Sequence, residues 1–566
     1  MRDMAASPVR TILDASPYFL FFGLMDSLAV FLCVWVITSL FMGYTIGISA
    51  LSIVVAALIS FALLAMKNKS SPPHKARELK THFTLGENKV DAVNIFPFIG
   101  VAMLIVLVMG VIFFGVQGGY DLSADAAPSV AASFIKSHIP LSYAPYFDVL
   151  FFYQLGLPLL VSQFTSIGIP SHQAAWGLGL LGIIFCFFAL VRWSIRLTGK
   201  QEAAYAVGVL FIGMRLPFLD LLVGEYALLF SFGIGLLAAF WAEENKILGG
   251  IGFAGAAITH PYMAIILFLF WMLAGNFVTL GQRFIGILQV AGIAFVGFFP
   301  VIWNQGIPYL QLAQAGQISA SEGALPSISS IAPLPIFFGI ISVAIALFAL
   351  IHLRQRAWNN PLIRKLGGLV IVALLGYLLF LFIPNAIFHS KFLELGWSGL
   401  LLFSSAYLAL AIPRKWLPSV LFCILVIGAA INFSSDDLNR LAIGSKATLR
   451  EAHFAERFSS TRADLPPARV LFFTPHSGKM AQYSNQIPVI ATSANFTLAV
   501  HSIRTPAVKK ILEETRIAKE AMEKNCVDCL GELDFDYLVI DTQRTPLLEL
   551  KTPLIVNDGF AVYAWD

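Results

Sequence analysis

Charged residues are scarce in this chain. Lys, Arg, Asp and Glu make up 12% of its 566 residues, about half of the roughly 25% that is usual in soluble domains. Hydrophobic residues make up 58%, and the mean hydropathy is +0.79. This composition excludes a soluble globular enzyme, a disordered protein and a fibrous protein. The net charge of +4 is too small to indicate a nucleic-acid partner.

Cysteines and nucleotide-binding motifs are scarce as well. Five cysteines in this length exclude a disulfide-rich scaffold. The sequence contains no Walker pattern or other nucleotide-binding fingerprint, which argues against an ATP-driven pump. Cys526 and Cys529 are the one Cys pair outside the apolar runs. Two thiols cannot complete a tetrahedral metal site, so the alternatives are a local disulfide or two free thiols.

What the sequence does contain is a series of long apolar runs. Runs of about 20 residues cross a bilayer as helices, which satisfy their own backbone hydrogen bonds. We therefore expect an α-helical polytopic membrane protein with about thirteen transmembrane helices. The short pair 248–260 and 262–277 is either a tight hairpin or one helix kinked at His260-Pro261. The expected spans are 18–41, 44–66, 95–117, 172–195, 203–219, 224–242, 248–260, 262–277, 284–303, 333–353, 366–384, 395–412 and 416–432.

Basic residues predict the orientation, because Lys and Arg collect in short cytoplasmic loops. The basic clusters all lie on one side of the membrane if the N-terminus is cytoplasmic, thirteen spans are counted and the segment 143–168 does not cross the membrane. We expect that segment, which contains Pro145 and Pro158, to be an interfacial helix on the outer face. The C-terminus then lies outside, most simply outside the plasma membrane. The clusters are the six basic residues of 67–94, Arg192 with Arg196 and Lys200, Arg354 with Arg356, Arg364 and Lys365, and Arg414 with Lys415.

The loops expected on the outer face hold few ionisable residues, and these lie near span ends. Charges close to a membrane are costly, so their collection at one face marks a candidate site. The alternative for each is an ordinary loop residue in headgroup water. These residues are Asp121, Asp125, Asp148, Arg215, Asp220, Glu225, Glu322, His389, Lys391 and Glu394.

The composition changes after Asn432. Charge rises and apolar runs shorten to strand length, which predicts a small extracytoplasmic α/β domain over 433–566. Thr505 and Pro506 are typical of the start of a helix, which we expect to end near Lys524. Strands are expected at 469–474, 488–491 and 537–541, followed by a hairpin of 554–556 with 560–565.

The first outer loop suggests a family. Its stretch from Gly118 to Pro140, which contains Asp121 and Asp125, follows a span directly and leads into Tyr143-Ala-Pro-Tyr146 and an aromatic segment. This order resembles the GT-C superfamily of membrane glycosyltransferases, as do the later stretches Thr259-His-Pro261, Phe299-Pro300, His389-Ser-Lys391-Phe392 and the tail. The pattern departs from the family after Asp125, where Ala126, Ala127 and Pro128 stand in place of a second acidic residue or a His.

The resemblance implies a fold and an activity. From about residue 95 onward it implies a GT-C-like core (95–432), with its first outer loop at 118–171, and the extracytoplasmic domain (433–566). The N-terminal transmembrane hairpin and basic cytoplasmic loop (1–94), expected from the apolar runs, have no counterpart in the simplest members. Members transfer a sugar, with inversion, from a polyprenyl-phosphate-linked donor to a lipid, polysaccharide or protein acceptor. Some members use a divalent metal ion. We assign none, because no ligand set of recognisable spacing is present.

The resemblance also assigns candidate roles. Asp125 matches the catalytic base, and Asp121 would share its face if the stretch is helical. Lys391, with His389 beside it, would stabilise the departing lipid phosphate, and Arg215 is a second candidate. The alternatives are span-end carboxylates kept in water, a snorkelling lysine and an ion pair of the arginine with Asp220 or Glu225.

Three further residues complete the expected site. His260, Glu394 and Tyr143 are candidates for contacting the acceptor or supporting the residues that do, although His260 could instead be a packing residue at a helix end. Two rival functions stay open. A transporter or lipid-glycan flippase would usually show internal repeats and mid-membrane charges, and neither is evident. A noncatalytic member would bind glycan or a protein partner through its outer domain.

Overall fold

The computed structural model describes most of the expected helices and the C-terminal strands. Its described residues are 17–42, 46–70, 142–143, 146–150, 155–169, 171–198, 200, 202–212, 225–274, 280–315, 340–352, 367–368, 370–371, 374–375, 389–413, 415–433, 450–451, 454, 457–458, 469–474, 489–491, 506–524, 526–542, 552–557 and 559–565.

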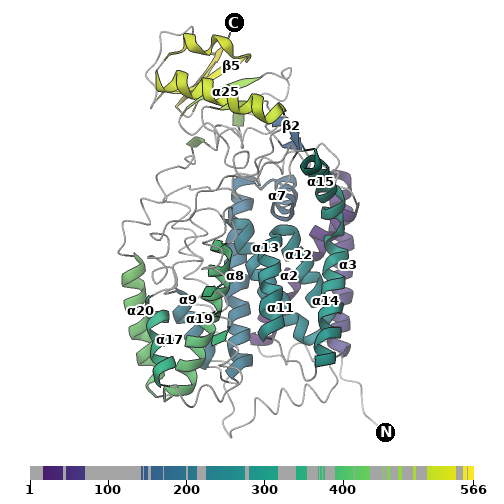
Figure 1. The fold of residues 1–566 in the computed structure, drawn as a ribbon, viewed down its shortest axis with the longest axis vertical. Coiled ribbons are helices and arrows are strands. Elements are labelled where there is room, and N and C mark those ends of the chain that lie inside the picture. Colours follow the sequence, from purple (N-terminus) through teal and green to yellow (C-terminus); the bar gives the residue numbers. More distant parts are fainter. Residues whose placement is uncertain are drawn as a thin grey trace.

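Helices form an upright bundle, and a small sheet with its covering helix lies at one end of it (Figure 1). The helices are α2 (Pro17–Met42), α3 (Ile46–Ser70), α7 (Gly156–Ser166), α8 (Ser171–Thr198), α9 (Glu202–Ile212), α11 (Tyr226–Glu244), α12 (Lys246–Thr259), α13 (Pro261–Ala274), α14 (Leu280–Val301), α15 (Ile307–Gln314), α17 (Ile340–His352), α19 (His389–Ala411) and α20 (Leu417–Phe433).

Within the described residues, four helical stretches are long and apolar enough to cross a membrane. They are Gly23–Phe41, Gln173–Thr198, Tyr226–Glu244 and Gly281–Leu312, and shorter apolar helices accompany them. The last stretch exceeds its expected span, because a π-helical turn, η2 (Ile302–Gly306), joins α14 to α15. The expected span 95–117 lies outside the described residues.

The chain around His260 forms a hairpin, which settles the two alternatives for this pair. His260 has an extended backbone (φ −156°, ψ 92°) that ends α12, and Pro261 occupies the first position of α13, where its missing N–H costs nothing. Trp271, near the end of α13, donates its indole N–H to Glu243 at the end of α11, 2.8 Å away. Since α12 starts directly after α11, the two short helices run antiparallel.

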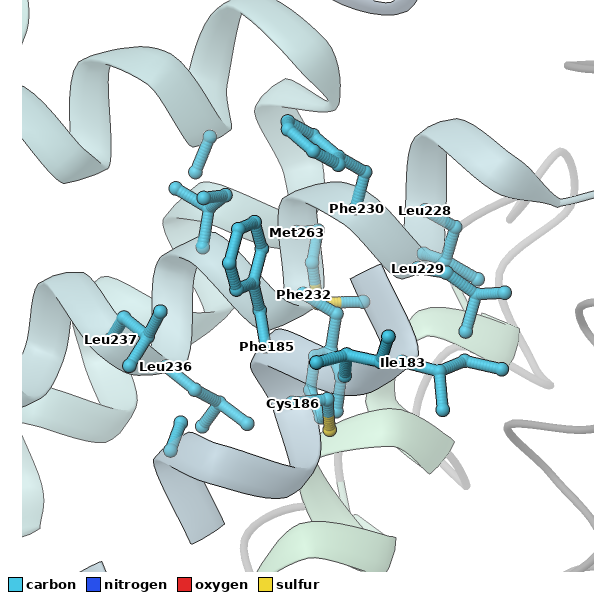
Figure 2. Packing of buried hydrophobic residues seen from close by; sticks show 14 of the residues in the cluster. Ile183, Phe185, Cys186, Leu228, Leu229, Phe230, Phe232, Leu236, Leu237 and Met263 are labelled. Carbon is cyan, nitrogen blue, oxygen red and sulfur yellow. The ribbon is translucent and has the colours of Figure 1, made fainter. Parts of the chain in front are cut away.

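Glycines allow the central helices to pack backbone against backbone. A Cβ placed on Gly182 of α8 would lie 2.5 Å from the backbone N of Phe230 in α11, and one on Gly233 of α11 would lie 2.4 Å from the carbonyl O of Gly182. Small residues at such crossings are typical of transmembrane helix pairs. Large apolar side chains such as Phe185 and Met263 fill the space around this contact (Figure 2).

The segment 143–168 differs from the expectation. It begins as a short antiparallel pair, β1 (Ser142–Tyr143) and β2 (Tyr146–Leu150), and continues as α7. Residues 156–163 of α7 are buried, while the chain from Ser166 to Ile169 is exposed. As expected, this helix is too short to cross. It packs inward against α2, α8, α11 and α12, and its place at the membrane interface stays a prediction.

The C-terminal residues form a five-stranded mixed sheet in the order β4-β3-β5-β7-β6. Its strands β3, β4 and β5 run parallel, whereas β5, β7 and β6 are antiparallel neighbours. Each expected strand position contains a strand: β3 (Val470–Phe473), β4 (Val489–Ala491), β5 (Tyr537–Asp541), β6 (Ile555–Asn557) and β7 (Phe560–Ala564).

Alternation along these strands separates two apolar layers. Val470 and Phe472 face the layer continuous with the bundle core, whereas Leu471 and Phe473 face a second layer under α25 (Pro506–Glu523). Beyond α25, Cys526 and Cys529 are joined by a disulfide, the first of the two alternatives weighed for this pair.

Candidate functional site

At one end of the bundle, ion pairs and hydrogen bonds of charged side chains connect neighbouring helices; we call it the ion-paired end. The buried Asp26 of α2, 5% exposed, accepts hydrogen bonds from an Arg192 guanidinium nitrogen at 2.5 Å and from the Trp241 indole nitrogen at 3.0 Å. Arg196 pairs with Glu243 at 3.4 Å. These contacts join α2, α8 and α11, so a charge in the first span is compensated by the second basic cluster.

The direction of α19 follows from one contact at the ion-paired end. Lys200, just after α8, donates from Nζ to the carbonyl O of Ala409 near the end of α19, at 3.0 Å. A helix of 23 residues is about 34 Å long. The first turns of α19, which contain His389, Lys391 and Glu394, therefore lie toward the opposite end of the bundle.

The opposite end contains the turn between α12 and α13. His260 is 4% exposed, and its Nδ1 accepts the backbone N–H of Met263 at 3.2 Å. This bond caps α13 and assigns the ring proton of neutral His260 to Nε2. The Ser231 hydroxyl contacts the carbonyl oxygens of Ala256 at 2.9 Å and His260 at 3.3 Å. His260 thus packs at a helix end, which was the second of the two roles considered for it. A contact between His260 and the acceptor stays a prediction.

Two further neutral polar residues lie in this part of the chain, Tyr262 at the turn and Gln305 after α14. The Tyr262 ring meets the His260 ring edge to face at 6.2 Å. Gln305 is buried in the π-helical turn η2, two residues after the exposed Trp303. Pi-helical turns often occur at functional sites.

Three described buried side chains of the bundle have polar atoms without a hydrogen-bond partner, one of them the Ser60 hydroxyl of α3. Both amide atoms of Gln163 in α7 lack one, as does the indole nitrogen of Trp397 in α19. Trp397 packs against the rings of Phe211 and Phe232, at 5.7 and 5.6 Å between centroids. Sequence reasoning missed Gln163, because nothing in a short proline-containing segment indicates that one glutamine is buried.

The structure describes only part of the expected site. Asp121, Asp125 and Arg215 lie outside the described residues. Tyr143 ends β1, and its backbone is paired with that of Tyr146. Among the described residues, no group of three or more His, Cys, Asp or Glu is arranged to hold a metal ion.

Comparison with known proteins identifies the architecture. No protein-family model matches this chain, and no curated protein matches it either. ArnT from Cupriavidus metallidurans, in a crystal structure with undecaprenyl phosphate bound, superposes with a TM-score of 0.54 at 10% identity, covering 83% of this chain and 98% of ArnT. Its apo structure gives a TM-score of 0.53 at 11% identity over the same shares. The chain has a GT-C-like fold.

The GT-C-like fold confirms the resemblance that the first outer loop and the tail suggested. It also agrees with the helical, membrane-embedded architecture expected from the apolar runs. At 10–11% identity the likeness concerns the fold alone, so the chemistry of the GT-C-like chain has to be argued from its own residues.

Proposed function

We propose that this chain is a membrane glycosyltransferase that transfers a sugar from a polyprenyl-phosphate-linked donor to a lipid, polysaccharide or protein acceptor. The observation that carries the proposal is the shared fold with ArnT, whose structure contains undecaprenyl phosphate. That lipid is a polyprenyl phosphate, the class of donor anchor implied by the first outer loop.

We infer that the reaction takes place at the opposite end of the bundle, on the extracytoplasmic face. The N-terminus and the basic loops then lie in the cytoplasm, and the C-terminal α/β domain lies outside the plasma membrane. The contact between Lys200 and Ala409 supports this orientation, since it sets Lys415, just beyond α19, near the second basic cluster at the ion-paired end. Lys and Arg collect on the cytoplasmic side of membrane proteins.

In the proposed reaction Asp125 is the general base. It accepts the proton of the acceptor hydroxyl or amine as that atom attacks the anomeric carbon from the side opposite the phosphate. The bond between the anomeric carbon and the phosphate oxygen breaks, so the product is inverted. Asp121 helps to orient the acceptor. Lys391, His389 and Arg215 stabilise the departing polyprenyl phosphate, as preorganised cations do for a developing anion.

Three residues are proposed to contact the acceptor or to support those that do. Glu394 follows Lys391 by one helical turn, so the two share a face of α19. Tyr143 stands in the β1–β2 pair just before α7. His260 would act through Nε2, since its Nδ1 accepts the Met263 N–H.

The test is sugar transfer by the full chain in nanodiscs, with polyprenyl-phosphate-linked sugars as donors. We expect Asp125→Asn to lower the rate roughly 100-fold or more, as loss of a general base does. Asp148→Asn, in the same outer loop, is the matched control and should keep its rate. Lys391→Met should also lose transfer, whereas Lys415→Met at the other end of the bundle should not.

Two results would reject parts of the proposal. Full activity of Asp125→Asn would remove the base assignment. Wild-type chains that transfer no sugar but carry lipid-linked glycan across proteoliposome membranes would be flippases instead.

A further inference from the structure

The helix α7 begins inside the bundle, against the α12–α13 turn, and runs outward toward the opposite end. A Cβ on Gly156, its first residue, would lie 2.5 Å from the Oγ1 atom of Thr259 and 2.8 Å from the Cα atom of Thr259. The other end of α7 leaves the packed core at Ser166. Gln163 is therefore the last fully buried residue before the helix reaches the exposed surface.

Gln163 lies on the same face of α7 as Gly156. Seven residues make just under two helical turns, so the two positions lie about 10 Å apart on one stripe. The Gly156 end of that stripe rests on Thr259, the residue next to His260. Phe164 fixes the rotation of α7, because its ring packs edge-on against Trp35 of α2 with 6.1 Å between centroids.

Gln163 is the exception among the polar side chains of α7. The hydroxyls of Ser162, Thr165 and Ser166 donate to helix carbonyls at 2.7–2.9 Å. The Gln163 side chain is 2% exposed, yet neither its Nε2 nor its Oε1 has a partner. Buried polar groups in native proteins are nearly always paired, so a ligand is a physical reason to keep an amide here.

The chemistry of the amide selects the kind of ligand. Carboxamides place a donor and an acceptor side by side without charge, which matches neighbouring hydroxyl groups. A phosphate needs cations or several donors, and a prenyl chain offers no hydrogen bonds. We propose that the Gln163 amide binds hydroxyl groups of the sugar that this enzyme transfers, with Nε2 donating and Oε1 accepting; this rests on the proposed function.

The test compares Gln163→Met, which has similar size without the amide, with Ser162→Ala on the same helix. Full-length chains in nanodiscs are assayed for thermal unfolding and for binding of undecaprenyl phosphate with and without an attached sugar. For Gln163→Met we expect an equal or higher unfolding temperature without ligand, because a partnerless polar group is removed. We also expect about tenfold or greater loss of affinity for the sugar-bearing lipid and unchanged affinity for undecaprenyl phosphate.

The controls separate the possible outcomes. Ser162→Ala should unfold slightly earlier and keep both affinities, since its hydroxyl is satisfied within the helix. A Gln163→Met variant that unfolds earlier and binds the sugar-bearing lipid normally would overturn the proposal and indicate a structural water. If wild type binds undecaprenyl phosphate and the attached sugar adds no affinity, the sugar subsite is wrong while the lipid assignment stands. If the wild-type protein binds neither lipid, the proposed function itself is rejected, whatever the Gln163 variant does.

Discussion

The two ends of the helix bundle differ in whether their buried polar side chains have hydrogen-bonding partners. At the ion-paired end, Asp26, Arg192, Arg196 and Glu243 pair with one another across helices. Toward the opposite end the buried amide of Gln163 and the buried indole of Trp397 lack partners, and Glu225 at the start of α11 and Lys391 and Glu394 in the first turns of α19 also lie on that side. Ion pairs between helices stabilise the bundle, whereas neutral polar groups without a partner can still form hydrogen bonds with a ligand. The comparison suggests that one end is built for stability and the other for a ligand.

Removing Asp26 should break the ion-paired end and have the largest effect on stability. Asp26→Ala leaves the Arg192 guanidinium partly buried without this carboxylate and removes the acceptor of the Trp241 indole. Losing one partner of a buried ion pair costs about 3–5 kcal/mol. We expect a loss of that size in chemical unfolding of the full chain in micelles. Asp26→Asn keeps an acceptor oxygen and should lose less, and equal stability of all three proteins would refute the role of this pair.

Between the two ends, the α8–α11 crossing depends on the absence of a side chain at Gly182. A Cβ there would meet the backbone of Leu229 and Phe230 at 2.5–2.6 Å, so Gly182→Ala should cost about 1–3 kcal/mol by overpacking. Gly177→Ala is the matched control on α8, because nothing lies within 4 Å of its added Cβ. It should be neutral or stabilise by about 0.5–1 kcal/mol, the usual gain of alanine in a helix. Equal unfolding of both variants would contradict this packing.

Outside the bundle, the disulfide should stabilise only the C-terminal domain. Cys526 and Cys529 close a loop of sequence separation 3, for which chain entropy predicts about 2 kcal/mol. The double change Cys526→Ser with Cys529→Ser should speed hydrogen exchange in α25 and the following turn, η4 (Asp528–Glu532). Exchange in α8 and α11 should not change, and faster exchange there would mean that the domain and the bundle unfold as one unit.

The smallest effect is expected at the exposed ion pairs of α25. The hydrogen bonds from Arg516 lower the pKa of the Glu513 carboxyl below its ordinary 4.5. A depressed folded-state pKa contributes stability above the unfolded value and loses it as the pH falls through the folded value. Glu513→Gln should therefore unfold slightly earlier than wild type at neutral pH. The difference should vanish in acid below the folded pKa, and a pH-independent difference would exclude this ion pair as its cause.

The sequence predicts most of the helices, because a bilayer requires long apolar runs and these are visible in any window of about 20 residues. The break at His260-Pro261 and the helix after Thr505-Pro506 follow from local start and stop signals, but only the structure decides between a hairpin and a kinked helix at His260. The burial of α7 could not be predicted. Pro145 and Pro158 correctly exclude a span, but nothing in those residues tells whether a short helix lies on the bundle or inside it.

Pairings between distant residues were also beyond the sequence. Asp26 stands 166 positions from Arg192 and 215 from Trp241, and a single acidic residue in an apolar run has many conceivable partners. For the same reason the partnerless amide of Gln163 is a property of the packed bundle alone. The charged residues assigned from the resemblance, Asp125 and Lys391, stay predictions.

The most direct test is a cryo-electron microscopy structure of the full chain in nanodiscs with undecaprenyl phosphate. The account predicts the phosphate at the opposite end of the bundle, within hydrogen-bonding distance of Lys391 and on the same side as Asp125 and Gln163. A phosphate bound beside Arg196 and Lys200 at the ion-paired end would contradict it.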